Sequence, residues 1–384
     1  MKLDKHAPVC PAHPSAITKG KMDSAAHSAR NENLQILRFV AAGLVLITHI
    51  TFYIHERVDS SVDIWHGGEA GVPIFFVISG FVMYLTGEKL PRNSDGAKLF
   101  LRRRVARVFP LYWLITTLKL AVAVVAPAAI LHNRPDLLHT LGSYILFPML
   151  NEEGRVQPLH GVAWTLLHEM FFYYIFSVCL LLRKSPLVWG SVTIGALWLV
   201  GLVVPAESAL ARVSFSEINL MFVVGMVLAW LHKRTYRLPH AVALLFLFTG
   251  IAMLAVPDFT TLRNKLIGGF SIEAVFLVAA LLSIKFAALP KSRMLLAKLG
   301  DSSYSLYLIH PILAPAVALI LFQFYIRSAY LILPMTFVIC VGTAHLVYRF
   351  VENPLNIKVG RLLDRVFTNR VLPNKPQTIN SHDS

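Results

Sequence analysis

The residues best placed to do chemistry lie in apolar segments, where ionisable side chains are costly. Arg38 and His49 stand eleven positions apart in LQILRFVAAGLVLITHI. On a helix this spacing is close to three full turns, so the two side chains share one face and lie about 16 Å apart along it. Arg38 could be a snorkelling anchor, whereas His49 lies too deep to reach water easily. The spacing predicts a guanidinium near one end of the face and an imidazole farther along, placed to act as a general base.

A basic cluster occurs in FLRRRVARVFPLYW, directly before another apolar segment. Arg104 and Arg107 in this cluster are three residues apart and therefore share a helix face. Guanidinium forks bind phosphate oxygens bidentately, so the pair suits a polyphosphate ligand. The alternative is an anchor for anionic lipid that enforces the topology of the chain.

An acidic residue lies about two turns inside a further apolar segment, in GVAWTLLHEMFFYY. A buried carboxylate such as Glu169 needs a cation, an imidazole or water beside it. We expect Glu169 to couple with His49, orienting the imidazole and stabilising its protonated form. The alternative is that Glu169 pairs with an unrelated helix for structure. Trp164, in the same motif, is expected to line the pocket.

Two further motifs contain polar side chains at regular spacing. LGDSSYSLYLIHPI places Tyr304, Tyr307 and His310 at intervals of three, which makes one polar stripe on a helix. The alternative is that the tyrosines belong to an aromatic belt at the membrane interface. If the residues form a polar stripe, Tyr304 and His310 are expected to line the substrate pocket. GVPIFFVISGFVMYL contains Ser79 and Gly80, and small residues predict a close helix–helix approach. Ser79 is also a candidate for the pocket wall.

These motifs belong to a chain of 384 residues that is 56% hydrophobic and only 15% charged, with a mean hydropathy of +0.61. Such values exclude an ordinary soluble enzyme and, away from the ends, disorder. Because backbone groups in lipid must be satisfied internally, the fold class is all-α: a polytopic integral membrane protein of about ten transmembrane helices. A bilayer core about 30 Å thick needs about 20 apolar residues per helix, and the segments near that length are 34–54, 71–87, 108–129, 162–182, 187–204, 216–231, 238–256, 268–286, 304–325 and 328–350.

The membrane domain, residues 34–352, is flanked by polar tails at 1–33 and 353–384. Lys and Arg gather in the tails and in alternate loops, so the positive-inside rule places both termini in the cytoplasm. The net charge of +15 is mostly this inner-face excess, and nucleic acid is not an expected partner. The apolar piece 137–150 is interrupted by Gly and Pro and is expected to be re-entrant or interfacial. Three scattered cysteines predict neither a disulfide framework nor a thiolate metal site, and no metal is expected.

Six motifs, in this order, resemble the acyltransferase 3 family of integral-membrane acyltransferases, and most closely its exopolysaccharide O-acetyltransferase branch. They are the Arg38–His49 pair, GVPIFFVISGF, FLRRRVARVFPLYW, WTLLHE followed by FFY, LGDSSYSLYLIHP and YRFVENP, and they span residues 33–354. The resemblance implies transfer of an acyl group, usually acetyl, from cytoplasmic acyl-CoA to a hydroxyl on the outer side of the inner membrane. It further implies that His49 is the essential histidine, Arg38 its motif arginine, Arg104 and Arg107 the basic pair, and Glu169 the acid.

On this interpretation acyl-CoA, usually acetyl-CoA, is a co-substrate and no cofactor is bound. The acceptor is a sugar hydroxyl of an exopolysaccharide or its lipid-linked precursor, and membrane lipids and polysaccharide assembly proteins are the other partners. His49 either takes the proton of that hydroxyl or carries the acyl group itself. Lipopolysaccharide, peptidoglycan, glucan, nodulation oligosaccharides and antibiotics are alternative acceptors. Alternatives outside the enzyme class are a proton-coupled transporter, since buried Arg, His and Glu also form proton relays, and an assembly scaffold without chemistry.

Overall fold

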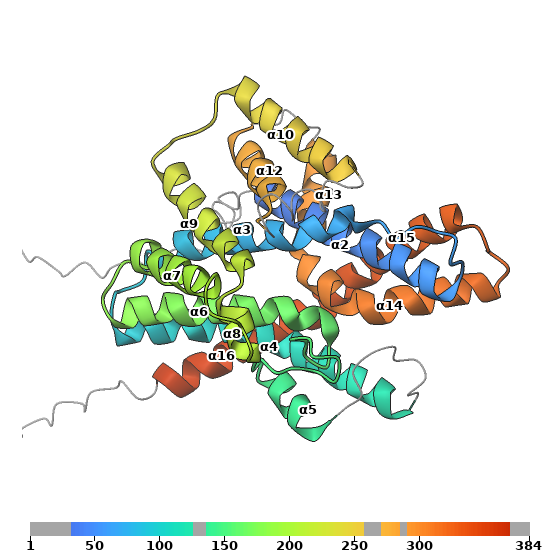
Figure 1. Ribbon diagram of the computed structural model, residues 1–384, viewed down its shortest axis with the longest axis horizontal. Helices are drawn as coiled ribbons and strands as arrows, with labels where there is room; N and C mark the ends of the chain where they lie inside the picture. Colours follow the sequence, from blue (N-terminus) through green and yellow to red (C-terminus); the bar gives the residue numbers. More distant parts are fainter. Residues whose placement is uncertain (1–31, 126–135, 257–269, 285–289, 369–384) are drawn as a thin grey trace, which may run out of the picture.

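The computed structural model is built of helices and describes residues 32–125, 136–256, 270–284 and 290–368 (Figure 1). Within these ranges there is no β-strand, and the single isolated bridge joins Leu150 to Val156. The expected all-α class is confirmed for this part of the chain. Of the predicted N-terminal tail, residues 1–33, only Glu32 and Asn33 are among the described residues, and both belong to α2, the first described helix.

Six helical stretches of the described chain are long and apolar enough to cross a membrane, so the protein is a polytopic membrane protein. They are α2 (Glu32–Arg57), η1 (His66–Ala70) with α3 (Gly71–Gly87), α4 (Ser94–Val125), η3 (Gly161–Ala163) with α6 (Trp164–Leu181), α14 (Ser303–Gln323), and α15 (Ala329–Val347), which continues through η6 (Tyr348–Glu352) into α16 (Asn353–Thr368).

The other four predicted spans contain shorter helices. These are η4 (Pro186–Gly190) with α7 (Ser191–Gly201), η5 (Glu217–Asn219) with α9 (Leu220–Lys233), α10 (His240–Ala255), and α12 (Ile272–Ser283). Every predicted segment therefore contains a helix, while the number of ten crossings and the cytoplasmic position of both termini stay predictions. Three further helices connect them: α5 (Leu137–Tyr144), α8 (Ala209–Ser214) and α13 (Pro290–Asp301).

Two boundaries differ from the sequence-based expectation. Helix α4 begins at Ser94, so the arginine cluster is part of the helix and does not precede it. The chain after Asn353 continues as α16 along α4, where Arg102 pairs with Asp364 at 2.8 Å. A helix placed at a polar surface needs only one apolar face, so the composition of this segment resembled a tail.

The core is formed where α2 and α3 cross the middle of the molecule (Figure 1). Helix α2 packs against α3, α13, α14 and α15, whereas α4 packs mainly against α6 and α16. Helices α10 and α12 form one edge of the molecule, and α14 and α15 form another (Figure 1). Residues from α2, α3, α4, α6 and α14 thereby meet around a common centre.

The predicted close approach at Gly80 is confirmed between α3 and α9. A Cβ on Gly80 would lie 2.1 Å from the carbonyl oxygen of Phe222, and one on Gly225 would lie 2.1 Å from that of Val77. Only glycine fits at such contacts. Because Gly80 faces α9, the side chain of Ser79 points toward α6, where it bonds to Glu169.

The segment predicted to be re-entrant or interfacial forms α5 and the turn after it. Its eight residues are too few to cross a bilayer. Leu138, Leu141 and Ile145 expose more than half of their surface. An apolar face of this kind agrees with a helix that lies at the membrane interface.

Candidate active site

A cavity of about 150 Å³ lies where α2, α3, α4, α6 and α14 meet. It brings together side chains that are far apart in the sequence. The predicted site residues in its wall are Arg38, Ser79, Arg104, Arg107, Glu169 and Tyr304. The remaining wall is mostly apolar, as is usual for a small-molecule site in which a few polar groups fix the orientation of the ligand.

Glu169 is held inside this cavity by two hydroxyl groups. Ser79 Oγ donates to Glu169 Oε1 at 3.0 Å, and the Tyr173 hydroxyl donates to the same oxygen. The carboxylate also acts electrostatically on Arg38. Tyr173 was not among the predicted site residues, although its spacing of four from Glu169 on one helix places it on the same face.

The expected coupling between Glu169 and His49 is wrong for this structure. No contact joins the two side chains within the described ranges; His49 packs against His310, with ring centroids 4.7 Å apart. The carboxylate whose charge acts on His49 is Glu69, near the end of η1 and just before α3. The two side chains were predicted at a similar depth, but depth along the membrane does not decide which helices are neighbours. Helix α14 packs against α2, whereas α6 packs against α4.

The two arginines of the predicted basic pair both line the cavity, but they differ in their partners. Arg107 donates to Glu352, which is fully buried and also accepts from Ser305 Oγ at 2.6 Å. Arg107 is therefore neutralised by the protein. Arg104 has its guanidinium carbon 5.9 Å from the ring centroid of Phe100, and its buried Nε makes no hydrogen bond to any described residue.

The predicted polar stripe on α14 is confirmed, and its tyrosines bond inside the protein. The Tyr304 hydroxyl donates to the carbonyl of Val108 at 2.7 Å, and the Tyr307 hydroxyl donates to the carbonyl of Val162 at 2.7 Å. Both tyrosines line the cavity. His310 follows one turn later, with its ring centroid 5.9 Å from that of Tyr307.

The His49–His310 contact lies beyond Tyr307, outside the wall of the cavity. His49 retains some exposed surface, whereas His310 is only 1% exposed. The Nδ1 atom of His310 lies 3.1 Å from the carbonyl oxygen of Leu306. Its Nε2 atom is buried and has no hydrogen-bond partner in the described part of the chain. The site thus has a cationic cavity at one end and a pair of imidazoles at the other.

The sequence relationships agree with this arrangement. Residues 31–345 match the family described as Acyltransferase domain, which covers most of the chain. The chain belongs to the acyltransferase 3 family. It is 32% identical over 265 residues to the exopolysaccharide production protein ExoZ of Rhizobium meliloti (strain 1021), covering 65% of this chain and 78% of ExoZ. It is 27% identical over 318 residues to the acyltransferase MdmB of Streptomyces mycarofaciens, covering 73% of this chain and 78% of MdmB. No solved structure matches significantly. The protein is an O-acyltransferase.

Two residues of this acyltransferase that were predicted to line the pocket lie outside the cavity wall: His310, which packs against His49, and Trp164. Trp164 packs at a right angle against His168, with ring centroids 5.6 Å apart, and is not in the cavity wall. His168 in turn bonds through Nδ1 to Asn219 Oδ1 at 2.9 Å. The expectation that Trp164 lines the pocket is not met, because the chain turns into α6 at this residue and presents Thr165 and Leu166 to the cavity instead.

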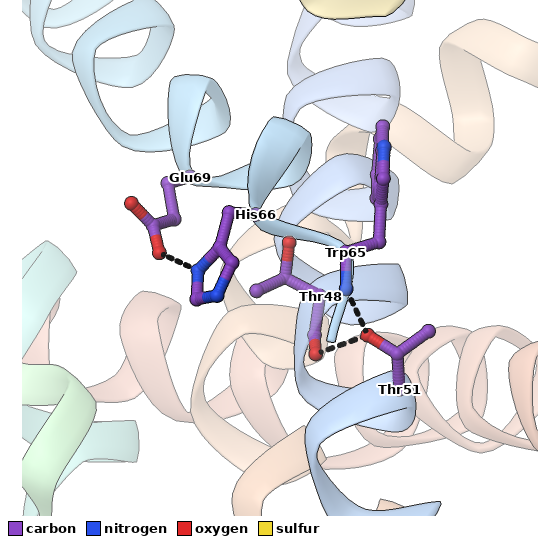
Figure 2. Close-up of polar contacts among 5 residues, drawn as sticks. All are labelled: Thr48, Thr51, Trp65, His66 and Glu69. Carbon is purple, nitrogen blue, oxygen red and sulfur yellow. Dashed lines mark hydrogen bonds and ion pairs between the residues drawn. The ribbon is translucent and has the colours of Figure 1, made fainter. Parts of the chain in front are cut away.

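The end of α2 beyond His49 is closed by the turn that leads into α3 (Figure 2). The backbone N–H of Trp65 donates to Thr51 Oγ1 at 3.1 Å (Figure 2). Gly68 lies directly on α2, since a Cβ there would be 2.0 Å from the carbonyl oxygen of Leu44. His66 and Glu69 form a 2.8 Å contact and are each 58% exposed (Figure 2). This turn holds the carboxylate of Glu69 close enough for its charge to act on His49.

An anionic ligand would find two uncommitted cations in the acyltransferase. Arg38 makes no hydrogen bond in the described ranges and, like Arg104, lines the cavity; the opposite charges that act on it are Glu169, Glu352 and Asp301. Guanidinium groups in a poorly solvated cavity bind phosphate oxygens strongly. Among the described residues, no group of three His, Cys, Asp or Glu side chains is arranged to hold a metal ion.

Proposed function

We propose that this acyltransferase moves an acyl group, usually acetyl, from cytoplasmic acyl-CoA to a sugar hydroxyl of an exopolysaccharide or its lipid-linked precursor. The observation that carries the proposal is the cavity with two uncommitted guanidiniums next to the imidazoles of His49 and His310. Acyl-CoA has phosphates at one end and a thioester at the other, so one ligand would use both parts of the site.

The donor occupies the length of α2. Arg38 and Arg104 bind its phosphates, and the eleven positions from Arg38 to His49 correspond to about 16 Å of helix. The pantetheine arm is of the order needed to bridge that distance. Glu169, bonded to Ser79 and acting on Arg38, keeps the donor end of the site in place; it does not orient His49.

In the transfer step His49 contacts the reacting atoms. The acceptor oxygen attacks the thioester carbonyl carbon while His49 takes the hydroxyl proton; the C–S bond breaks and the proton passes to the departing thiolate. A positioned general base typically contributes about 10²- to 10⁴-fold to such a step. The other route begins with attack by the imidazole nitrogen and forms an acyl-imidazole, which the hydroxyl then consumes.

The acceptor class is proposed from the name of a relative together with the position of the site. ExoZ is named as an exopolysaccharide production protein, and a sugar hydroxyl is a poor nucleophile that needs a base. The protein lies in the inner membrane with both tails in the cytoplasm, where polysaccharide assembly proteins and membrane lipids are its neighbours. MdmB, named only as an acyltransferase, leaves other acceptors of the same family as the second candidate.

The test is the O-acyl content of the surface polysaccharide, measured by NMR in a deletion strain that expresses the wild type, His49→Ala or the control His240→Ala. His240 is the exposed first residue of α10 and makes no contact with the site. We expect acylation to return with the wild type and the control only. Label from [¹⁴C]acetyl-CoA should reach the polysaccharide in inverted vesicles. A strain whose polysaccharide is unchanged by deletion would overturn the proposed acceptor.

A further inference from the structure

We infer that His310 is the positioning residue of His49: its Nε2 accepts the ring N–H of His49 and so fixes which nitrogen of His49 faces the reacting group. The inference rests on the proposed function, because it assigns a role within the same reaction. It states which ring nitrogen of each histidine carries the proton. The spacing of the polar residues on α14 does not determine this.

The tautomer of His310 is fixed by its hydrogen bond to the backbone carbonyl of Leu306. A carbonyl oxygen only accepts, so the 3.1 Å contact with Leu306 requires the proton of His310 to be on Nδ1. Nε2 then carries a lone pair and no hydrogen. That atom is buried and unpartnered among the described residues, although buried acceptors are nearly always satisfied.

His49 is the imidazole that packs against the ring of His310 and can supply the missing donor. The two ring centroids are 4.7 Å apart and the planes are inclined by 57°. Two imidazoles joined by a linear N–H···N bond have centroids about 5 Å apart, given a donor–acceptor distance of about 2.9 Å. The separation of the two rings is therefore compatible with such a bond, and catalytic hydrogen bonds commonly tighten only when substrate is bound.

Other groups around the pair do not replace this acceptor. Tyr53 packs against His49 with centroids 6.1 Å apart, and its hydroxyl points to the carbonyl of Pro311 at 3.4 Å. Tyr307 donates to the carbonyl of Val162. Glu69 acts on His49 only through its charge, and His160 acts on His310 in the same way.

The arrangement gives His49 a defined part in the proton balance. With one N–H donated to His310, the other nitrogen of His49 has a free lone pair and, since His49 is the more exposed ring, it meets the acceptor hydroxyl. It takes that proton, holds it while the C–O bond forms and the C–S bond breaks, and returns it to the thiolate. His310 stays neutral throughout. If His49 carries the acyl group instead, the same bond selects its nucleophilic nitrogen.

The kinetic test is a double-mutant cycle on acyl transfer from labelled acetyl-CoA, with His310→Leu, His49→Ala and their combination. We expect His310→Leu to lower kcat about 10- to 100-fold, part of the contribution of a general base, while KM for the donor stays within about twofold. In the His49→Ala background His310→Leu should not lower kcat further, because the two residues act as a unit. His310→Gln, whose side-chain oxygen can accept the N–H, should recover part of kcat.

The control for loss of a buried imidazole is His168→Ala, since His168 bonds to Asn219 and does not touch His49. Membrane level and thermal unfolding are measured for every variant. An equal loss from His310→Leu with and without His49, or His310→Gln as inactive as His310→Leu, would overturn the inference.

A second readout does not depend on activity. ¹⁵N NMR of histidine-labelled protein in nanodiscs should show one fixed tautomer for His49 in the wild type and a mixture in His310→Leu. A fixed tautomer without transfer from acetyl-CoA would support the pair and refute the proposed function. Acyl transfer by a wild type in which His49 is a mixture of tautomers would support the proposed function and refute the inference about His310.

Discussion

The two ends of the site solve the problem of buried polar groups differently. At the cavity, charge is retained and mostly compensated: Arg107 by Glu352, and Glu169 by the hydroxyls of Ser79 and Tyr173. At the other end, two imidazoles need no counter-ion when neutral, and Nε2 of His310 has no hydrogen-bond partner among the described residues. Charge in a membrane protein is costly, so it persists where a partner or an incoming ligand of opposite sign supplies the compensation. The cavity is thus suited to binding an anion, and the imidazole pair to moving a proton.

The largest expected effect separates chemistry from binding. His49→Ala should lower kcat by about 10²- to 10⁴-fold, because the general base is lost, while the affinity for acyl-CoA stays unchanged, because the cavity is intact. Single-turnover transfer and equilibrium binding of labelled acetyl-CoA to purified protein measure the two quantities. An equal loss of binding would mean that the two ends do not have separate roles.

Arg107→Gln should damage the fold more than donor binding. It leaves the carboxylate of Glu352 buried without its cation, which typically costs about 3–5 kcal/mol of stability. Adding Glu352→Gln removes the unpaired charge and should recover most of this loss. Thermal unfolding of the purified variants is the measurement. A stable Arg107→Gln with weakened donor binding would place Arg107 with the ligand-binding arginines.

Arg104→Gln should show the opposite pattern. Hydrogen bonds to charged groups contribute about 1.5–3 kcal/mol, so the Kd for acyl-CoA should rise about 10- to 100-fold, with little change in unfolding. Arg103→Gln is the control, since Arg103 lies on the same helix but is exposed and outside the cavity. An equal rise in Kd for Arg104→Gln and Arg103→Gln would indicate that the arginine cluster is an anchor for anionic lipid.

The smallest effect is expected at Ser79. Ser79→Ala removes one of two hydroxyl donors to Glu169, and Tyr173 keeps the carboxylate oxygen bonded. Loss of one hydrogen bond typically costs about 1 kcal/mol, which corresponds to about a fivefold lower rate of acyl transfer. The comparison with Ser79→Thr, which keeps the hydroxyl, shows whether the hydrogen bond or the volume matters. A loss shared by Ala and Thr would indicate packing.

Features that follow from one helix were determined by the sequence. The apolar segments predicted helices in the right places, and the helical period put Arg104 with Arg107, and Tyr307 with His310, on shared faces. The motifs also indicated the acyltransferase family correctly. These relations hold because the rise and turn of an α-helix are fixed by its backbone hydrogen bonds, whatever surrounds it.

Features that depend on two helices were decided only by the tertiary structure. His49 meets His310 instead of Glu169, and Arg107 finds its partner in Glu352, 245 positions later in the chain. Contacts such as that of Gly80 with Phe222 set which helices are neighbours and how each is rotated. The depth of a residue in the membrane can be estimated from the chain, but its neighbours around the helix axis are fixed by the packing of all the helices together.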